Sequence, residues 1–478
     1  MQNVFLKLIN LFRSKENSNK PDTIGNIALD QNKQDLDNLK YLFPEKDIDF
    51  KNFGKNELNY STIVHHHENF LKSIKNFLKN EDLEKTKNFL NTINNFYNET
   101  TKFYLDLFSF DKIFMESLNK IVSKDTNTLI SFTIWGKKYS ERFSILALNS
   151  LENEIIELYK KYKIQIILFI DETANNILIN KDNFKTLEQM GIIKTIIIPS
   201  KIFQLKYFLD RISIARYFVF GFIQNICWRF CAEKNINLSL LTPDNFYSKG
   251  FLSSLVERVN EKEDLFAIFS NSSLKVQVSN FDTINELTKE LKKMNLNQLF
   301  DFFKQNIHHS FYDYFIFNNK KIESNSPMYI LNNQKELCIY SLHSHPYIIS
   351  NKYLNKFKNF QTFLPIDESF PTLNNFDTKY FEKNLDLKSG ICLDFAEFEN
   401  FNKQVSDFSE KHILENFGRF KNNKLRMWLL KNPVKLEHKE NSKIVFNILN
   451  DNEKSKKNYD AELTDNLNPS FEKIIKEI

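Results

Sequence analysis

Short apolar runs alternate with segments of helical spacing along residues 128–252. Each run is rich in β-branched residues, is apolar on both faces, and is followed by a polar turn and then by a helical segment. Strands buried on both sides show this pattern, and parallel sheets are built from such strand–helix units. We therefore predict an α/β fold with a mainly parallel sheet flanked by helices. The four strand-and-turn segments are 129–139, 164–173, 192–199 and 236–245.

The same periodicities predict further elements around these strands. Helical spacing between and after the strands predicts helices over about 139–161, 183–190, 202–232 and 247–260. Additional strands are predicted at Leu265–Ser270, Leu274–Val278, Met328–Leu331 and Leu337–Leu342.

The chain of 478 residues is long enough for two or three domains. Its start is polar and lacks periodicity, and the apolar positions after it recur at helical spacing. We predict a polar N-terminal tail or linker over 1–60, a helical region over 61–125, the α/β domain over 126–400, and a C-terminal helical and polar extension over 401–478.

Charge and cysteine content narrow the function classes. A net charge of +5 from 65 basic and 60 acidic residues is small and dispersed, which disfavours nucleic acid as a partner. Four cysteines without a Cys-x-x-Cys pair fit a reducing compartment, so we predict a cytoplasmic protein. The segment Ile212–Cys231 contains two arginines and is predicted to be a buried helix rather than a membrane span. An amphipathic start at Met1–Phe12 leaves peripheral contact with the inner membrane as an alternative to a core-docked helix.

Ligands of parallel sheets bind at the carboxyl ends of the strands, and polar residues stand at these positions. Trp135 and Gly136 end the first segment and precede a helix that begins near Tyr139, where a phosphate or nucleoside could lie against amide N–H groups. Asp171 and Glu172 end the second, where carboxylates can accept hydrogen bonds from a ribose hydroxyl or a uracil N–H. An ordinary turn and a helix N-cap are the alternative interpretations.

Asp244 and Asn245 end the fourth segment, directly before a helix that starts at Phe251 or Leu252. A carboxylate here faces the same edge of the sheet as Trp135 and Gly136, and it can bind a metal that bridges a diphosphate or contact a sugar directly. The alternative is an Asx turn at a strand–helix corner. The agreement in location between the segments favours a functional role for Asp244.

The order of these elements resembles that of bacterial glycosyltransferases of the GT-A fold, in particular a group whose acidic motif follows the fourth strand as Pro243-Asp244. The resemblance covers roughly residues 128–400, and it implies a GT-A-like domain there. It implies a nucleotide-diphospho-sugar donor bound by the first turn and by Asp171, with Asp244 at the position of the acidic motif. The usual Asp-x-Asp is absent, because Asn245 and Phe246 follow Asp244. Use of Mn²⁺ or Mg²⁺ with Asp244 as a ligand therefore stays open.

The resemblance implies transfer of a sugar to a cell-surface glycan, a lipid-linked acceptor or a protein. The alternative is a non-catalytic α/β scaffold or binding protein of the same fold.

His343 and His345 follow an apolar strand in a His-Ser-His-Pro sequence. Alternation along a strand places both imidazoles on one face, where they could bind a metal or hold a diphosphate as cations. A similar element in the glycosyltransferase group implies a place beside the donor phosphates. Histidines packed before a proline turn are the alternative.

A carboxylate is needed to take the proton of the acceptor hydroxyl when a sugar is transferred with inversion. Asp367 and Glu368, which come after the histidines in the chain, are the predicted catalytic carboxylates, and Asp394 and Glu397 are further candidates. No spacing rule chooses between them.

Overall fold

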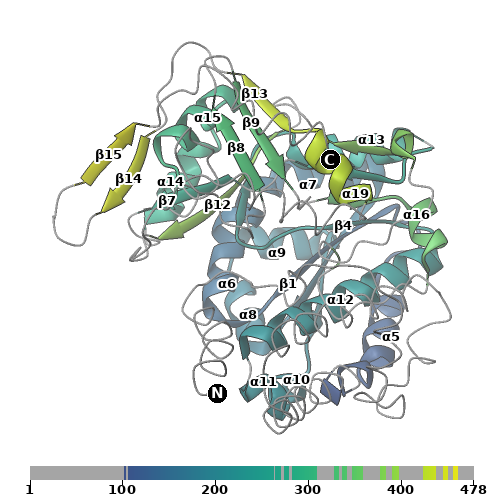
Figure 1. Ribbon diagram of the computed structural model, residues 1–478. Coiled ribbons are helices and arrows are strands. Elements are labelled where there is room, and N and C mark those ends of the chain that lie inside the picture. Colours follow the sequence, from purple (N-terminus) through teal and green to yellow (C-terminus); the bar gives the residue numbers. More distant parts are fainter. Residues whose placement is uncertain are drawn as a thin grey trace, which may run out of the picture. The chain divides into compact units, whose positions relative to one another are not determined.

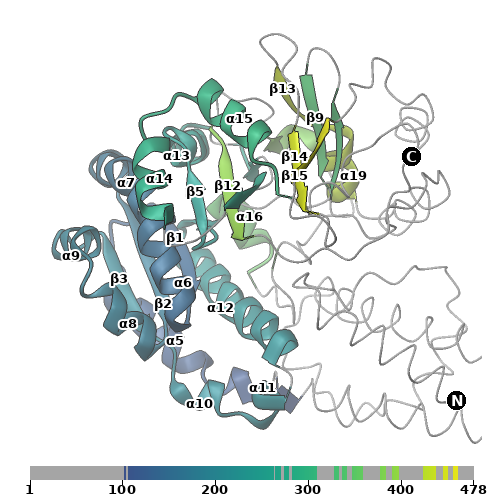
Figure 2. The same cartoon turned by 90° about the vertical axis from the view of Figure 1, so that its left-hand side faces the viewer.

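The computed structural model describes the central part of the chain with interruptions, as Figures 1 and 2 show. It divides into two compact units, one of Met1–Glu116, Pro199–Arg229 and Asn359–Pro371, and one of the remaining residues. The described residues are 102–103, 106–210, 212–262, 264–270, 274–278, 283–308, 328–332, 336–341, 347–358, 366, 377–383, 390–397, 424–437, 445–449 and 456–460.

The larger unit is organised around a seven-stranded sheet in the order β11-β6-β10-β4-β1-β2-β3. β10 runs antiparallel to both of its neighbours, and every other strand runs in one direction. The strands are β1 (Thr128–Ile134), β2 (Ile164–Ile170), β3 (Ile193–Ile197), β4 (Asn237–Leu240), β6 (Ala267–Phe269), β10 (Tyr347–Ile349) and β11 (Phe381–Lys383). The predicted α/β fold, with a mainly parallel sheet flanked by helices, is confirmed.

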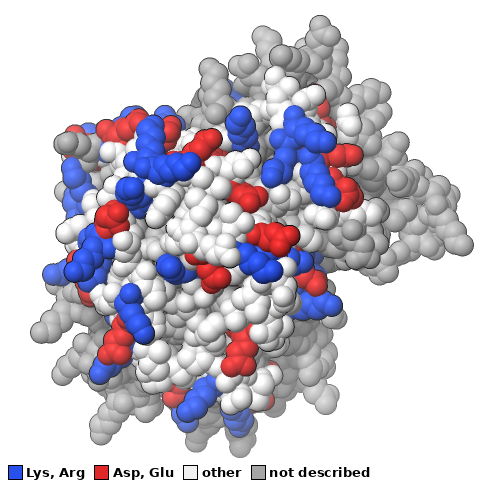
Figure 3. Space-filling model, turned by 180° about the vertical axis from the view of Figure 1, so that it is seen from behind, with Lys and Arg blue, Asp and Glu red and all other residues white. Residues whose placement is uncertain are grey.

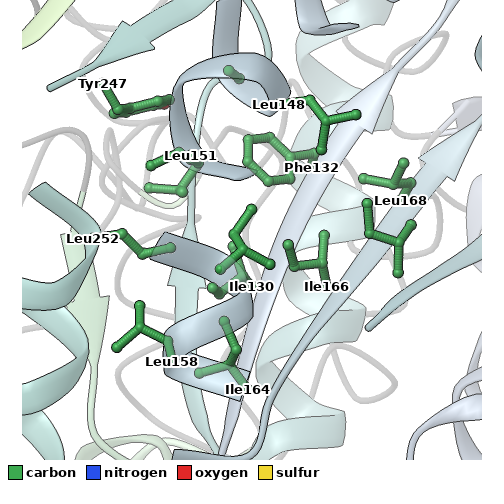
Figure 4. Close-up of a cluster of buried hydrophobic side chains, with 14 of the residues drawn as sticks. Ile130, Phe132, Leu148, Leu151, Leu158, Ile164, Ile166, Leu168, Tyr247 and Leu252 are labelled. Atoms are coloured by element: carbon green, nitrogen blue, oxygen red, sulfur yellow. The ribbon is translucent and has the colours of Figure 1, made fainter. Parts of the chain in front are cut away.

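The apolar runs form the centre of this sheet because their side chains are buried on both faces. Every residue of β1 and β2 is buried. Alternate side chains of the two strands join helical side chains in one core, since residues two apart in a strand point to the same face. Burial of each large apolar side chain contributes about 1.5–3 kcal/mol. Figure 4 shows the strand residues Ile130, Phe132, Ile164, Ile166 and Leu168 facing Leu151, Leu158 and Leu252.

Helices connect the strands and cover the sheet. Those between β1 and β3 are α6 (Gly136–Phe143), the π-helical η2 (Ser144–Leu148), α7 (Asn149–Tyr162), α8 (Glu172–Leu178) and α9 (Asp182–Gln189). Later in the chain come α13 (Phe251–Glu261), α14 (Ile284–Leu291), α15 (Leu296–Gln305), α16 (Asn351–Lys356), the 3₁₀ turn η5 (Thr378–Tyr380) and α19 (Lys424–Lys431).

Smaller sheets accompany the central one in the larger unit. One, hereafter the small sheet, has the strand order β5-β12-β7, formed by Asn245–Tyr247, Cys392–Glu397 and Leu274–Val278. A second has the order β13-β9-β8, formed by Val434–Glu437, Glu336–Ser341 and Met328–Asn332. β14 (Val445–Leu449) and β15 (Lys456–Asp460) pair antiparallel.

The smaller unit is held together by aromatic packing. Phe103 stacks on Tyr207 with 4.8 Å between ring centroids, and Phe218 contacts both rings. Arg229 forms an ion pair with Asp111. Its described elements belong to α5 (Asp111–Ile121), α10 (Ser200–Phe203), α11 (Lys206–Asp210) and α12 (Ile212–Lys234), and α5 and α12 continue into the larger unit. Among the described residues, no helix is both long and apolar enough to cross a membrane.

The structure corrects the wider of the two bounds predicted for one helix. The helix predicted over about 247–260 begins at Phe251, which is the start expected from the Asp244 segment, because Asn245–Tyr247 pair with β12 as the strand β5. Leu274–Val278 is a strand as predicted, and it lies in the sheet of β5 and β12. The predicted domain boundaries stay predictions.

Candidate functional site

The turns after β1, β2 and β4 lie at the same edge of the central sheet. Parallel pairing places Ile134 beside Ile170 and Ser131 beside Leu240. The residues directly after these strands therefore meet at the carboxyl edge, as the sequence predicted for a ligand site.

Asp171 ties two of these turns together. Its carboxylate accepts hydrogen bonds from the Gly136 N–H, at 3.1 and 3.2 Å, and from the Ala174 N–H at 2.7 Å. The second bond caps α8, and the first fixes Gly136, whose φ of +72° favours glycine. As a result α6 and α8, which come after the two strands, start from one carboxylate and lie side by side (Figure 2). The N-cap interpretation describes these contacts, and a role of Asp171 in donor binding stays a prediction.

The other donor-binding candidates of these turns lie nearer the surface. Trp135 is half-buried, Glu172 is exposed, and Tyr139 is 37% exposed. An exposed aromatic ring at a strand end could stack on a nucleobase, and an exposed carboxylate could accept from a ribose hydroxyl. The Gly136 N–H donates to Asp171, so it is not directed at a phosphate in this structure.

Tyr247 holds the loop that carries Asp244 through hydrogen bonds to the Thr242 backbone. The Tyr247 hydroxyl donates to the Thr242 carbonyl at 2.8 Å and accepts from the Thr242 N–H at 3.0 Å. Burial raises the pKa of this tyrosine well above its usual value, so the hydroxyl keeps its proton. Asn245 is buried, and its amide donates to Thr242 Oγ1 and to Cys392 Sγ. The donor-binding role predicted for Asn245 stays a prediction, and its present contacts are structural.

Asp244 stands among charged groups from three other elements. Its Oδ2 lies 4.0 Å from Arg142 Nη1 on α6, and the two side chains are 23% and 13% exposed. Burial and the nearby charge of Asp394 raise the pKa of Asp244 to about 6, against the opposing effect of Arg142 and Lys275. Burial also raises the pKa of Asp394, which Lys275 and Arg142 lower. Two carboxylates and two cations thus form a charge-balanced cluster, hereafter the quartet.

The small sheet supplies half of the quartet. Asp394 on β12 is the backbone partner of Asn245 on β5 and of Lys275 on β7, so one cross-strand row places them next to each other. Asp394 was one of four carboxylates between which the sequence could not choose. Arg142 and Lys275 were missed. For Lys275 the one available signal was the alternation of Leu274–Val278, which leaves Lys275 on the polar face of its strand.

The remaining predicted residues lie outside the described residues. These are the donor-binding candidates His343 and His345 and the catalytic candidates Asp367 and Glu368. Glu397 ends β12, and its side chain also lies outside the described part.

The charge of Asp244 predicts a pH dependence of stability. Its pKa in the folded protein, about 6, exceeds the ordinary value of 3.8, so the native state binds this proton more tightly than the unfolded chain. The free energy of unfolding should therefore fall as the pH rises from about 4 to above 6. Urea unfolding of the wild type and of Asp244→Asn at several pH values measures this effect. We expect a flatter curve for Asp244→Asn, and identical curves would contradict the shift.

Two carboxylates can contribute to a metal site but do not complete one. Within the described ranges, no group of three or more His, Cys, Asp or Glu side chains could hold a metal ion. Asp244 and Asp394 offer the oxygen atoms that Mg²⁺ and Mn²⁺ prefer, and their proximity disfavours two negative charges, which a divalent cation would relieve. These two residues could supply part of the ligand set of such a cation, and its other ligands would have to come from elsewhere.

Similarity to known proteins is confined to a distant likeness in structure. No family model and no curated protein matches the sequence. Among the solved structures that match is core-mannan synthase A from Aspergillus fumigatus in its Mn/GDP form. The two sequences are 12% identical, and the TM-score is 0.27. The matched region spans 62% of this chain and 85% of the mannan synthase chain. So weak a likeness does not define a function.

Proposed function

We propose that the protein is a glycosyltransferase that moves a sugar from a nucleotide-diphospho-sugar donor to an acceptor hydroxyl. The observation that carries this proposal is the place of Asp244, at the carboxyl edge of the central sheet and beside Asp394, Arg142 and Lys275. The sheet edge is where α/β proteins bind nucleotides. A half-buried cluster of opposite charges there provides groups for both a sugar and a diphosphate.

Within this proposal, each side chain has a chemical task. Asp244 contacts the donor sugar or diphosphate, and Asp244 and Asp394 would hold Mg²⁺ or Mn²⁺. Such an ion would neutralise charge on the departing diphosphate. Arg142 and Lys275 oppose the negative charge that the two carboxylates bring together.

The donor and acceptor contacts extend beyond the quartet. Trp135, Tyr139 and Glu172 would contact the nucleoside, and His343 and His345 the phosphates. Asp367 or Glu368 would take the proton of the acceptor hydroxyl. The acceptor would be a cell-surface glycan, a lipid-linked acceptor or a protein, reached in the cytoplasm or at the inner membrane surface.

A second candidate function is a non-catalytic α/β binding protein of the same fold. The contacts of Asp171 and Asn245 favour it, because both side chains make hydrogen bonds within the protein that need no ligand. The lysine, arginine, aspartate and glutamate residues on the face shown in Figure 3 are interspersed, which gives no support to nucleic acid as the partner.

Nucleotide binding separates the two candidates. We expect UDP, GDP or CDP, or the corresponding nucleotide sugars, to raise the melting temperature, because a ligand at tens of times its Kd adds about 2 kcal/mol of apparent stability. A thermal-shift series with and without Mn²⁺ measures this, with the matching nucleosides as controls for the diphosphate. If no nucleotide shifts the transition of protein that is folded by circular dichroism, the binding-protein candidate is favoured.

A further inference from the structure

Arg142 is fixed at its place by the turn before it. It lies in the last turn of α6, whose first residue Gly136 is held by Asp171. The Ser140 hydroxyl, one turn before the end of the helix, donates to the Gly136 carbonyl at 2.6 Å. Ser140 and Phe143 are buried, and Phe143 packs edge-to-face on Phe132 of β1. The Ser140 bond lies within the helix, whereas the Asp171 and Phe132 contacts join it to other elements and would break if the helix rotated or slid.

The π-helical turn η2, directly after α6, fixes the end of the helix that carries Arg142. A π turn changes the direction in which later side chains point, and such turns are frequent at functional sites. In η2, Leu146 packs in the core of the small sheet, whereas Ala147 and Leu148 pack in the core of the central sheet. Residues of η2 thus anchor the end of α6 in the cores of the central sheet and the small sheet. The loop after the central strand β4 carries Asp244, and the small sheet carries Asp394 and Lys275.

Arg142 and Asp244 form a largely desolvated pair. Their atoms are 4.0 Å apart, and both side chains are mostly buried, so water screens their attraction less than it does at the surface. A guanidinium stays charged at every pH used with proteins. Because 4.0 Å is longer than a hydrogen bond, the planar fork of Arg142 acts on the carboxylate through its charge. Lys275 has its own neighbour, because it pairs in register with Asp394.

We propose that Arg142 is a positioning residue of the site: it holds the Asp244 carboxylate in the orientation in which it contacts the donor. This inference rests on the proposed function and adds to it a residue of α6 that acts through Asp244. Arg142 itself need not touch the donor. Its loss leaves Asp244 in place but without the charge that orients it.

The first test needs no ligand. Free energies of unfolding of the wild type, Arg142→Gln, Asp244→Asn and the double variant at pH 8 give the coupling between the two side chains. We expect Arg142→Gln to destabilise the wild type and to have much less effect when Asp244 is already Asn. Additive effects would overturn the proposal.

The second test uses transfer kinetics with the nucleotide sugar that binds best. We expect Arg142→Gln to lower kcat about 100-fold, which is the size of effect that a misplaced group produces, with a small change in donor KM. Arg142→Lys should recover part of kcat, because it restores the charge without the fork. Arg258→Gln is the matched control, since Arg258 on α13 pairs with Glu382 outside the quartet, and it should leave kcat unchanged.

The outcomes distinguish this inference from the proposed function. Unchanged kcat in Arg142→Gln, with a large loss in Asp244→Asn, would overturn the positioning role and leave the transferase standing. Coupling between Arg142 and Asp244 in a protein that binds no nucleotide would sustain the pairing of the two side chains. That result would overturn the proposed function and, with it, the statement that Asp244 is oriented toward a donor.

Discussion

Asp244→Asn is expected to lower the kcat of sugar transfer roughly 10²–10³-fold while the protein stays folded. The substitution keeps the size of the side chain and removes the charge that would contact the donor sugar, its diphosphate or a bound cation. The side chain is only 23% exposed, and the amide of asparagine fills the same space, so the fold should tolerate the change. Steady-state kinetics with a saturating nucleotide sugar, and circular dichroism of both proteins, measure the two parts of this expectation.

Asp377→Asn is the matched control for this substitution. Asp377 caps a 3₁₀ turn and pairs with Lys379, away from the quartet, and its side chain is 45% exposed. The control should keep wild-type kcat. Wild-type turnover in Asp244→Asn would remove this residue from the site and, with it, the strongest support for a transferase.

Gly390→Ala is expected to destabilise the protein by roughly 2–4 kcal/mol. Gly390 has a φ of +84°, and a Cβ there would lie 2.8 Å from the Phe251 Cα and 2.9 Å from Ser248 Oγ. Phe251 is the first residue of α13, so its backbone cannot easily move away from the added Cβ. The next residue, Ile391, exchanges hydrogen bonds with Ser248, and these bonds hold β12 against the segment after β5. Urea unfolding measures the loss.

Gly191→Ala separates crowding from backbone strain. Gly191 also has a positive φ, +75°, but the nearest atom to its Cβ would be the flexible Lys194 Nζ at 4.0 Å. We expect a loss of about 1–2 kcal/mol there, from the left-handed backbone alone. An equal loss at both glycines would contradict the close approach at Gly390.

The strands at the centre of the sheet were predictable because their signal is local. β1 and β2 are largely apolar on both faces, β3 and β4 lie within shorter apolar runs, and apolar positions in the helices between them recur about every 3.6 residues. The same local signal placed Asp244 at a strand end, since the end of an apolar run is visible in the sequence.

The apolar runs that became β6, β7, β8 and β9 were predicted as strands, but β5, β10 and β11 were not predictable in this way. β10 and β11 have three residues each, too few for a period, and their place is set by partners far away in the chain. β5 was hidden in the turn before α13, because only its pairing with β12 makes it a strand.

The charged members of the site depend on the same distant pairings. Asp394 meets Asp244 through the pairing of β12 with β5, and no spacing in the sequence encodes this contact. Arg142 looks like any solvated helix residue until the fold brings α6 beside the loop after β4. The sequence therefore supplies Asp244 and leaves its neighbours to the tertiary structure.

The bond between Ser248 and Ile391 has a consequence for synthesis on the ribosome. The two residues are 143 positions apart, and β12, which carries Asp394, begins directly after the second. At 5–20 residues per second, roughly 7–30 s pass between the translation of these positions. During this interval the nascent chain holds Asp244 and Arg142 without Asp394, and the unpaired edges of β5 and β7 are open to wrong partners. The pairing of β5 and β7 with β12 can form only after β12 has left the ribosome.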